Sequence, residues 1–303
     1  MPSNSKEIRR RIKSTQSIAK ITKAMELVSA AKMRKAQSAA QASRPYATLS
    51  AQLLRNIAGK TGQLNHPLMK RMVDGKGGSK TLTVVVTSDK GLAGSLNSNV
   101  IHKAVRVLNG DLSAEGGSLP AGQAGASGGD FITVGRKGAD AIKRFGGNII
   151  ASFPGKDKGI TSLDSRPIAE IAMNDFVAGK YAKVFIVYPH FVSTLVQKSQ
   201  ILQVLPFVEG EGGREKGEEF LFEPSPGEVL ELLIIRVIEF MIFQALVETA
   251  ASEHSARMVA MKNANEAAKD LIDDLSLSYN QARQGGITRE LSEISAAKLA
   301  MEG

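Results

Sequence analysis

Apolar side chains recur at helical intervals in the N-terminal part of the chain. The residues of this row are Ile18, Ile21, Met25 and Val28. Their steps of three, four and three residues place them on one face of an α-helix. No Gly occurs between residues 4 and 58, and Gly weakens a helix more than any residue except Pro. The pattern predicts one long N-terminal helix over residues 1–60, with this row as its buried seam.

A second helical pattern occupies the C-terminal part, residues 223–303. Its seam consists of Met258, Met261, Asn265, Ala268, Ile272, Leu275, Tyr279 and Ala282. Alternating steps of three and four form a heptad pattern, which is typical of a helix that supercoils with a partner. The N-terminal helix is the obvious partner. We therefore expect the two terminal helices to pair antiparallel.

The middle of the chain, residues 61–222, alternates between two patterns. Short apolar runs typical of buried strands are followed by segments with helical spacing. The expected strands are residues 81–88, 131–135, 148–153, 182–189 and the extended segment 196–208, and the expected helices are residues 97–108, 136–145 and 164–178. This alternation indicates a small, mostly parallel sheet with helices, a Rossmann-like α/β domain.

The predicted fold class is therefore α/β plus a long coiled coil, with an antiparallel pair of N- and C-terminal helices. Two segments of the central domain, residues 113–130 and 209–219, are too rich in Gly and charged residues to build a core. We expect both to be flexible insertions.

The net charge of +9 is concentrated near the N-terminus. The ten basic residues among residues 1–35 are Lys6, Arg9, Arg10, Arg11, Lys13, Lys20, Lys23, Lys32, Arg34 and Lys35. Only two acidic residues, Glu7 and Glu26, lie among them. A helix of this charge favours an acidic partner: nucleic acid, anionic lipid or an acidic protein surface. With no Cys and four scattered His, no disulfide, metal site or cofactor is expected.

Neither a secretory signal nor a membrane helix is expected. The basic start lacks the apolar stretch of a secretory signal. Residues 229–247 are strongly apolar, but Glu231, Arg236 and Glu239 lie in their middle. Each charge would cost a few kcal/mol at the centre of a bilayer. We interpret this segment as a buried helix of a folded domain.

The most enzyme-like stretch is "VTSDKGLAGSLN", residues 86–97. A strand, a Gly-containing turn and a helix start are the parts of a phosphate-binding loop, although neither common phosphate-loop motif is present. Gly91 and Gly94 fit a tight turn better. Ser88 and Asp89 are adjacent but have no His near them in sequence, so no nucleophile–base pair is predicted.

The stretch "NQARQGGITRE", residues 280–290, interrupts the C-terminal helix pattern with Gly285 and Gly286. Two readings are open. The pair can mark a frayed helix end, or it can give another protein close access to the backbone beside the hydrogen-bonding side chains of Gln284 and Thr288.

Several motifs together resemble a known family. They are "KITKAMELVSAAKMRKAQ" at residues 20–37, "ASRPYA" at 42–47, "SDKGLAGSLN" at 88–97, "ASEHSARMVAMKNANEAAKDLI" at 251–272 and "LSYNQARQGGITRELSEI" at 277–294. In order and in residue identity, these motifs are similar to those of the gamma subunit of F-type ATP synthase. The resemblance covers essentially the whole chain.

The resemblance implies a rotor shaft with no catalytic site of its own. Its coiled coil would lie inside a hexamer of three alpha and three beta subunits, and its base would rest on the epsilon subunit and the membrane c-ring. Proton flow would turn the ring and the shaft, which would drive the beta subunits through the conformations that make ATP. The implied location is the cytoplasmic face of a bacterial inner membrane, with membrane contact only through the c-ring.

The resemblance also implies five contact residues for the beta subunit. Met25 in "KAMELV" and Arg257 in "SARMVAM" would meet the acidic lever segment of beta. Arg283, Gln284 and Thr288 in "ARQGGIT" would meet a beta loop called the catch. The lever would also be the acidic partner of the basic first helix. The resemblance also implies that the C-terminal helix continues through Gly285 and Gly286 toward Leu291.

The chain departs from the family pattern at some points. Lys90 and Ala93 replace the Arg and Cys that are common in the turn. The two Gly-rich segments are additional, and we expect them to be disordered or to contact an accessory regulatory subunit. Two other functions are carried as alternatives: a basic coiled-coil protein that binds nucleic acid, and a nucleotide-binding α/β enzyme with helical arms, which would rest only on residues 86–97.

Overall fold

The computed structural model describes residues 3–60, 66–69, 80–108, 129–156, 159–207, 223 and 225–302. The chain divides into two compact units. One contains residues 1–30 and 257–303, and the other contains residues 31–256. Two long helices, α1 (Ser3–Lys60) and α5 (Pro226–Glu302), contribute to both units.

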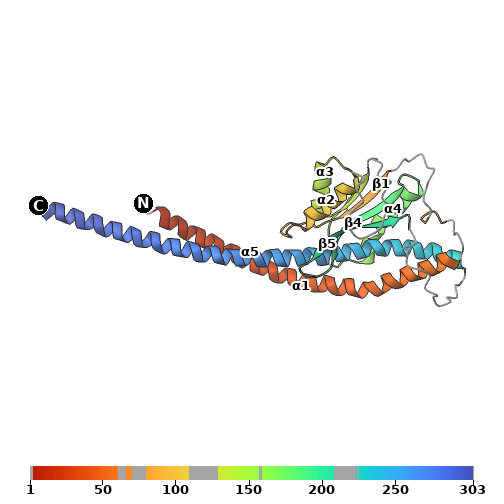
Figure 1. Ribbon diagram of the computed structural model, residues 1–303, viewed down its shortest axis with the longest axis horizontal. Coiled ribbons are helices and arrows are strands. Elements are labelled where there is room, and N and C mark those ends of the chain that lie inside the picture. Colours follow the sequence, from red (N-terminus) through yellow and green to blue (C-terminus); the bar gives the residue numbers. More distant parts are fainter. Residues whose placement is uncertain are drawn as a thin grey trace. The chain divides into compact units, whose positions relative to one another are not determined.

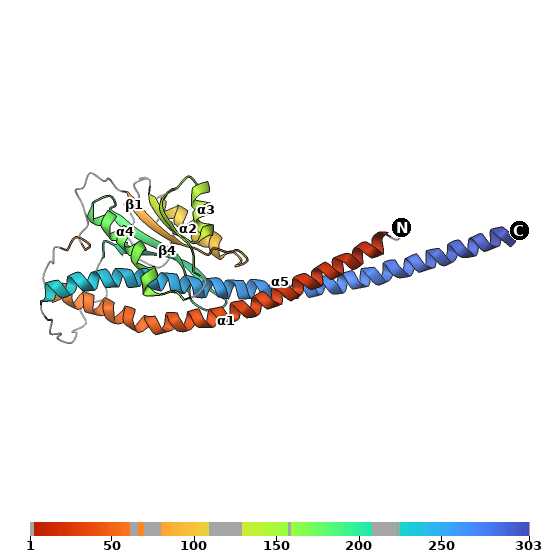
Figure 2. The ribbon, with the colours of Figure 1, turned by 180° about the vertical axis from the view of Figure 1, so that it is seen from behind.

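Helices α1 and α5 pack together and run antiparallel (Figures 1 and 2). In the larger unit, Ser43 Oγ donates to Gln244 Oε1 at 2.6 Å, and the ring of Tyr46 lies 4.9 Å from that of Phe240. The partner number falls as the α1 number rises, which is the signature of antiparallel helices. The predicted pairing of the terminal helices is confirmed.

The predicted seam on α5 is confirmed in the smaller unit. Every member from Met258 to Ala282 is buried or partly buried, whereas most of the residues between them are exposed. The amide of Asn265 donates from Nδ2 to the carbonyl oxygen of Ala19 at 2.6 Å. A buried polar side chain at a seam position is typical of a coiled coil whose register is specified.

The predicted seam on α1 is wrong. Ile18, Ile21 and Val28 are exposed, and Met25 is only partly buried. The buried residues of this stretch are Thr15, Thr22 and Ser29, with Ile8, Ile12 and Ala19 partly buried. The physical reason is the small size of the four central side chains, Thr15, Ala19, Thr22 and Ser29, which lets α5 approach the α1 backbone closely there. The bulkier Ile8 and Ile12, nearer the N-terminus, are only partly buried. The hydroxyls of Thr15 and Thr22 donate to carbonyls of their own helix, at 3.0 Å each, so burying them leaves no unpaired donor.

Helix α5 continues well past the end of its heptad seam. Gly285 and Gly286 lie inside the helix, and a Cβ on either would meet no atom within 4 Å. The reading of this pair as a frayed helix end is therefore wrong, and the expected continuation toward Leu291 is confirmed. All residues at positions 283–298 are exposed.

The larger unit is built on a five-stranded sheet with the order β3-β2-β1-β4-β5. The strands are β1 (Thr81–Val86), β2 (Asp130–Val134), β3 (Asn148–Phe153), β4 (Lys183–Phe191) and β5 (Gln197–Leu205), and the shorter helices are α2 (Leu96–Leu108), α3 (Arg136–Arg144) and α4 (Arg166–Val177), preceded by the 3-10 turn η1 (Ser162–Asp164). Three pairings are parallel and only β4 with β5 is antiparallel. The strands, the helices and the mostly parallel sheet agree with the sequence prediction.

Helices cover both faces of this sheet (Figure 1). On one face, Val85, Phe131 and Phe185 pack with residues of α2 and α3. On the other face, Val84 and Ile132 pack with residues of α4 and α5. Because successive side chains of a strand point to opposite faces, both faces of β1, β2 and β4 are buried. The order 3-2-1-4 of the four parallel strands is that of a Rossmann-like fold.

The apolar segment at residues 229–247 lies in α5 and covers the sheet. Its buried residues Leu230, Ile234, Ile238 and Ile242 repeat every fourth position. This confirms its interpretation as a buried helix. Among the helices that the structure describes, none combines the length and the apolar character needed to cross a membrane.

The two Gly-rich segments lie outside the described residues, except for the last two positions of the first. Of these, Gly129 is buried and Asp130 begins β2. The strand therefore starts inside the segment that the sequence assigned to an insertion.

The corrected α1 seam can be tested with two adjacent substitutions. Thr22→Lys should lower the free energy of unfolding by about 2–4 kcal/mol, because it forces an unpaired charge into the helix interface. Ile21→Lys adds the same charge one position away and should change it by less than about 0.5 kcal/mol. Thr22 is 8% exposed and Ile21 is 58% exposed. Urea unfolding of the full chain, followed by circular dichroism, measures both. If Ile21→Lys lowered the free energy of unfolding more than Thr22→Lys does, the seam predicted from the sequence would be correct and this assignment wrong.

Candidate functional site

The three residues expected to contact the catch lie on the part of α5 beyond its seam. Arg283, Gln284 and Thr288 are all exposed. Ala282, the last seam residue, directly precedes them and is partly buried. The site thus begins where the contacts between the two helices end, and its side chains are carried by a continuous helix.

An apolar row lies beside these polar residues. Ile287, Leu291 and Ile294 are exposed and follow one another at steps of four and three, so they share one face of the helix. Arg283 and Gln284 are four and three residues before Ile287 and belong to the same side. An exposed apolar row next to charged and amide groups is typical of a surface that another protein covers.

Met25 of α1 and Arg257 of α5 lie in a different part of the paired helices from Arg283, Gln284 and Thr288. Met25 is partly buried, and Arg257 is 6% exposed. On a straight helix, Arg257 and Arg283 would be about 39 Å apart. The five predicted residues therefore form two groups. In the described structure, Arg257 is a buried side chain of the helix pair, whereas the group around Arg283 is open.

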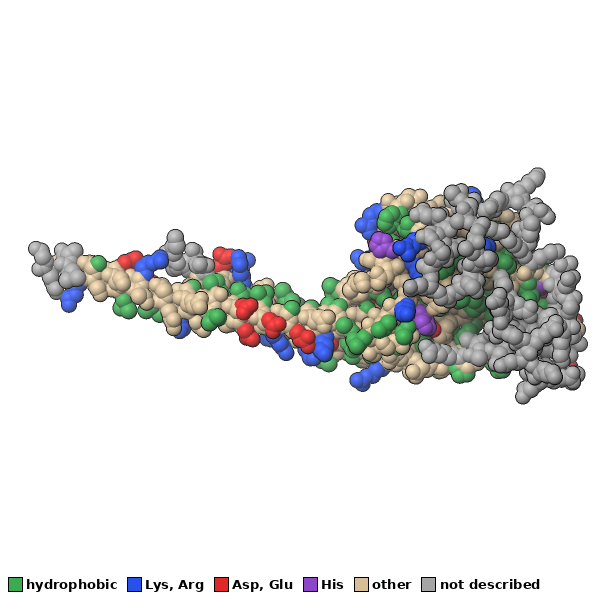
Figure 3. All heavy atoms as spheres, in the orientation of Figure 1, with side chains coloured by type: hydrophobic (Ala, Val, Ile, Leu, Met, Phe, Trp, Pro, Cys, Tyr) green, Lys and Arg blue, Asp and Glu red, His purple; other side chains and the backbone are tan. Residues whose placement is uncertain are grey.

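The basic N-terminal stretch is exposed but is accompanied by acidic residues of α5. Two of its cations already have partners within the helix, since Arg11 contacts Glu7 at 2.7 Å and Lys23 contacts Glu26 at 3.0 Å. The exposed acidic residues of α5 in the same unit include Glu266, Asp270, Asp273 and Asp274. Figure 3 shows Asp and Glu side chains beside Lys and Arg on the long helices. Continuous phosphate binding would need a surface of one sign, so this mixture weakens the nucleic-acid alternative.

The turn at residues 87–97 is a structural junction. One carboxylate oxygen of Asp89 accepts hydrogen bonds from the backbone N–H of Arg136, at the start of α3, and of Gly155, after β3, at 2.9 and 3.1 Å. The chain's own carboxylate therefore occupies the helix N-terminus beside the turn, where an anion would otherwise be favoured. Asn97 Oδ1 accepts from the backbone N–H of Ser88 at 3.1 Å. These bonds show that the stretch is a tight structural turn between β1, α3 and β3, and they weaken the nucleotide-binding alternative, which rested on it.

Gly135 explains why the turn can pack this closely. Its φ of +90° lies in the region that favours Gly, and a Cβ there would lie 2.1 Å from the carbonyl oxygen of Thr87. The hydroxyl of Thr87 donates to the carbonyl of Val134 at 3.1 Å and accepts from the N–H of Gly138 at 2.8 Å. The ends of β1 and β2 and the start of α3 are thus joined without a ligand.

A hydrogen-bonded network around the buried Glu248 joins both long helices to the sheet inside the larger unit. Glu248 of α5 is 4% exposed. Its Oε2 lies 2.5 Å from Nδ1 of His190 on β4, and its Oε1 accepts from Nε2 of Gln244 at 2.8 Å. Gln244 in turn accepts from Ser43 of α1. Burial, with the nearby charge of Glu248, raises the pKa of Tyr188, so this phenol stays neutral.

The relatives of the chain identify its family. A family model for ATP synthase matches residues 4–301. The ATP synthase gamma chain of Pelotomaculum thermopropionicum is 42% identical over 301 residues, which cover 98% of this chain and 99% of that one. The chain belongs to the ATP synthase gamma chain family. Another gamma chain, from Roseiflexus castenholzii, is 39% identical over 302 residues and 99% of each chain.

Solved structures share the fold of this gamma family member. A chain in the central stalk and c-ring of the Tetrahymena thermophila mitochondrial ATP synthase has a TM-score of 0.57 at 24% identity, covering 80% of this chain and 99% of that one. A chain in the rotor of the Euglena gracilis mitochondrial ATP synthase has a TM-score of 0.63 at 19% identity, covering 95% and 100%. The common fold has two long terminal helices and, between them in the sequence, a domain with an α/β sheet.

Two features of this gamma chain were missed by sequence reasoning. The apolar row from Ile287 to Ile294 has helical spacing and could have been found by extending the helix pattern past the glycines. The network around Glu248 could not be found from the sequence, because Ser43 and His190 lie far from Gln244 and Glu248 in the chain and the four residues form no motif.

Proposed function

We propose that the chain is the rotating shaft of an ATP synthase. As a member of the gamma family, it is a non-catalytic subunit of the central stalk, and the catalytic sites belong to the beta subunits. In our proposal, rotation of the c-ring turns the chain, and the turning helices drive the three beta subunits through their conformations in sequence. The single observation that carries the proposal is the stretch of α5 at residues 283–298, where polar and apolar side chains are all exposed.

That part of the helix has the features of a surface with a partner. A helix without neighbours in water normally exposes polar residues all round, whereas this one exposes Ile287, Leu291 and Ile294. Its two glycines have no neighbouring atoms within 4 Å of an added Cβ, so another backbone can approach there. These features support docking inside a ring of larger subunits.

We propose roles for the two groups of contact residues. Arg283, Gln284 and Thr288 contact the catch loop of a beta subunit, and Met25 and Arg257 lie at the level of its acidic lever. Contacts of exposed charged side chains are weak, typically ~0–1 kcal/mol each. Weak contacts suit a shaft that must leave one beta subunit and engage the next. The buried position of Arg257 favours a role in shaping the helix pair beneath that contact.

The wider assembly follows from the same proposal. The partners are three alpha and three beta subunits, the epsilon subunit and the c-ring. An accessory regulatory subunit is a further candidate partner, which would contact the Gly-rich segments. The chain then sits on the cytoplasmic side of a bacterial inner membrane as a peripheral subunit that reaches the membrane only through the c-ring.

Reconstitution tests the function directly. The purified chain, mixed with alpha and beta subunits of its own synthase, should form a stable complex and raise the rate of ATP hydrolysis above that of alpha and beta alone. Gel filtration and a coupled ATPase assay measure the two effects. Absence of both assembly and stimulation would refute the shaft proposal. A DNA affinity that falls steeply with salt would instead favour the nucleic-acid alternative.

The contact with the catch is tested by the double substitution Arg283→Ala and Gln284→Ala. Both side chains are exposed, so the melting temperature of the isolated chain should change little. Coupled ATP synthesis in membrane vesicles should fall several-fold, because about 1–3 kcal/mol of hydrogen bonding at the interface is lost. The matched control is Asn280→Ala with Gln281→Ala, one turn earlier and also exposed. Unchanged synthesis in the first variant, or an equal loss in the control, would contradict the assignment.

A further inference from the structure

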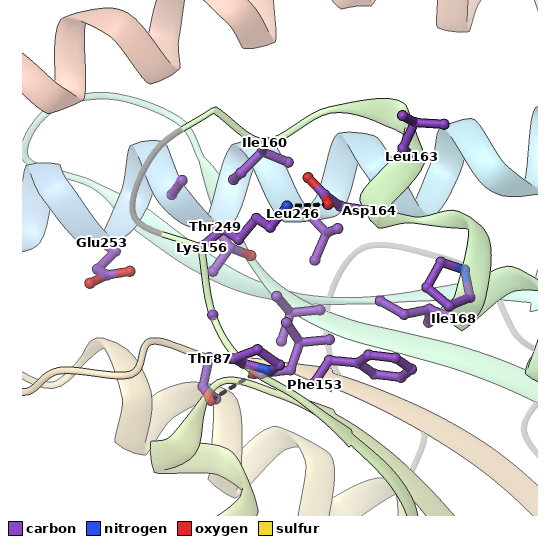
Figure 4. Close-up of a pocket in the computed structure, with 16 residues that line it drawn as sticks. Thr87, Phe153, Lys156, Ile160, Leu163, Asp164, Ile168, Leu246, Thr249 and Glu253 are labelled. Carbon is purple, nitrogen blue, oxygen red and sulfur yellow. Dashed lines mark hydrogen bonds and ion pairs between the residues drawn. The ribbon is translucent and has the colours of Figure 1, made fainter.

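A cavity of about 180 Å³ lies inside the larger unit, between the sheet and α5 (Figure 4). Its polar side chains include Thr87 and Thr249, whose hydroxyls bond to backbone groups of the same unit, and the ion pair of Lys156 with Asp164. Because these groups are paired already, they do not select a ligand. A buried amide in the smaller unit is different, since the partner of Asn265 lies on the other long helix.

The side of α1 that faces α5 in the smaller unit repeats every seven residues. It consists of two rows of buried or partly buried side chains. One row is Ile8, Thr15, Thr22 and Ser29, and the other is Ile12, Ala19 and Glu26. A helix with such a repeat presents the same side again when it is shifted along its partner by one heptad, about 10 Å. The repeat alone therefore does not define the register of α1 against α5.

The hydroxyl row distinguishes poorly between these registers. After a shift of one heptad, Thr22 takes the place of Thr15 or of Ser29, so a hydroxyl side chain replaces a hydroxyl side chain. The hydroxyls of Thr15 and Thr22 each donate to a carbonyl of their own helix at 3.0 Å. They need no partner on α5 and are satisfied in every register.

The amide of Asn265 does distinguish between the registers. Its side chain is 6% exposed, and Nδ2 donates to the carbonyl oxygen of Ala19 at 2.6 Å and lies 3.4 Å from Oγ1 of Thr22. The distance between packed helices depends on the side chains at the contact. The single methyl group of Ala19 lets α5 come close enough for a side-chain amide to reach the α1 backbone.

In the shifted registers, a larger side chain takes the place of Ala19. Ile12 would hold the two helices further apart, and the amide of Asn265 would be buried without its acceptor, which is costly. Glu26 would bring a carboxylate under α5 and away from Lys23, to which it is now bonded at 3.0 Å, and burying a charge is costly as well. Both shifts are therefore opposed at the same place on the helix pair.

We propose that Asn265 is a positioning residue that locks the register of the helix pair through its bond to the carbonyl of Ala19. The bond forms in one register and is lost when α1 is shifted by a heptad in either direction. A buried amide of this kind lowers the stability of a coiled coil but specifies one pairing.

The register determines which residues of α5 are covered by α1. The buried seam of α5 ends at Ala282, and residues 283–298 are all exposed. A shift of α1 by one heptad toward the C-terminal end of α5 would lay it against residues 283–289. The lock thus keeps Arg283, Gln284 and Thr288 accessible. This consequence rests on the proposed function, whereas the lock itself does not.

Distances between two spin labels on the full chain test the lock. Ser17→Cys on α1 and Glu290→Cys on α5 are both at exposed positions, and the sequence has no other Cys. Pulsed electron paramagnetic resonance should give one narrow distance. Adding Asn265→Leu should produce a second population displaced by about 10 Å, one heptad. The same variant should raise the melting temperature by about 2–4 °C, because Leu replaces a buried amide. Loss of a merely structural hydrogen bond would lower it.

Two further variants locate the lock. Ala19→Ile places the same residue at positions 12 and 19, which makes two registers alike, and should produce the second population with Asn265 intact. Ala24→Ile, on the exposed side of α1, is its matched control and should keep the single distance. Ser43→Ala removes a bond between the same helices in the larger unit and should also keep it. Circular dichroism checks that each variant is folded.

The proposal is overturned if Asn265→Leu keeps the single distance, if it lowers the melting temperature, or if Ala24→Ile or Ser43→Ala produces the same second population. Coupled ATP synthesis in membrane vesicles then tests the consequence separately, and it should fall several-fold in Asn265→Leu. A second population with unchanged synthesis would uphold the lock and contradict the proposed contact at Arg283, Gln284 and Thr288.

Discussion

The close approach of α1 and α5 is the constraint on which the shape of the proposed contact surface depends. Small and hydroxyl side chains, Thr15, Ala19, Thr22 and Ser29, face the partner helix, and the amide of Asn265 reaches a backbone carbonyl of α1. Because bulky side chains are not needed between the helices, Ile18, Ile21 and Val28 are left on the outside. The register of this pairing also sets the position on α5 that lies opposite the N-terminal end of α1. Residues 283–298 of α5 are all exposed, and this is the surface that we propose contacts another subunit.

In the larger unit, α5 serves two neighbours at once. Its row from Leu230 to Ile242 completes the core on one face of the sheet, and its contacts with Ser43 and Tyr46 hold α1. Glu248 joins these roles, since one of its carboxylate oxygens faces the sheet through His190 and the other faces Gln244. A force applied to the sheet can pass to both helices through these hydrogen-bonded side chains, of which Glu248 is buried and the others are partly buried. This is the mechanical property that a shaft with a globular base requires.

Sequence patterns predicted what depends on local spacing. The heptad seam of α5 follows from its spacing of three and four residues, and the strands and helices of the central domain follow from short apolar runs and helical spacing. The structure has these elements close to the expected positions, in a mostly parallel sheet. The α1 seam failed because hydrophobicity was taken to mean burial, whereas here size decides which residues face the other helix. The start of β2 at Asp130 was hidden by its Gly-rich surroundings. The Glu248 network and the cavity depend on tertiary placement, which no local pattern encodes. The proposed contact residues come from the family resemblance alone, because no local pattern in this chain indicates what they contact.

Rotation of the chain inside the assembled enzyme is the most direct test of the account. The sequence has no Cys, so Leu195→Cys, at a loop position that is 76% exposed, provides one unique attachment point for a gold particle. With the alpha and beta subunits fixed to a surface and ATP supplied, the account predicts stepwise rotation of the particle in one direction. A labelled chain that stays bound and motionless while the complex hydrolyses ATP would contradict it.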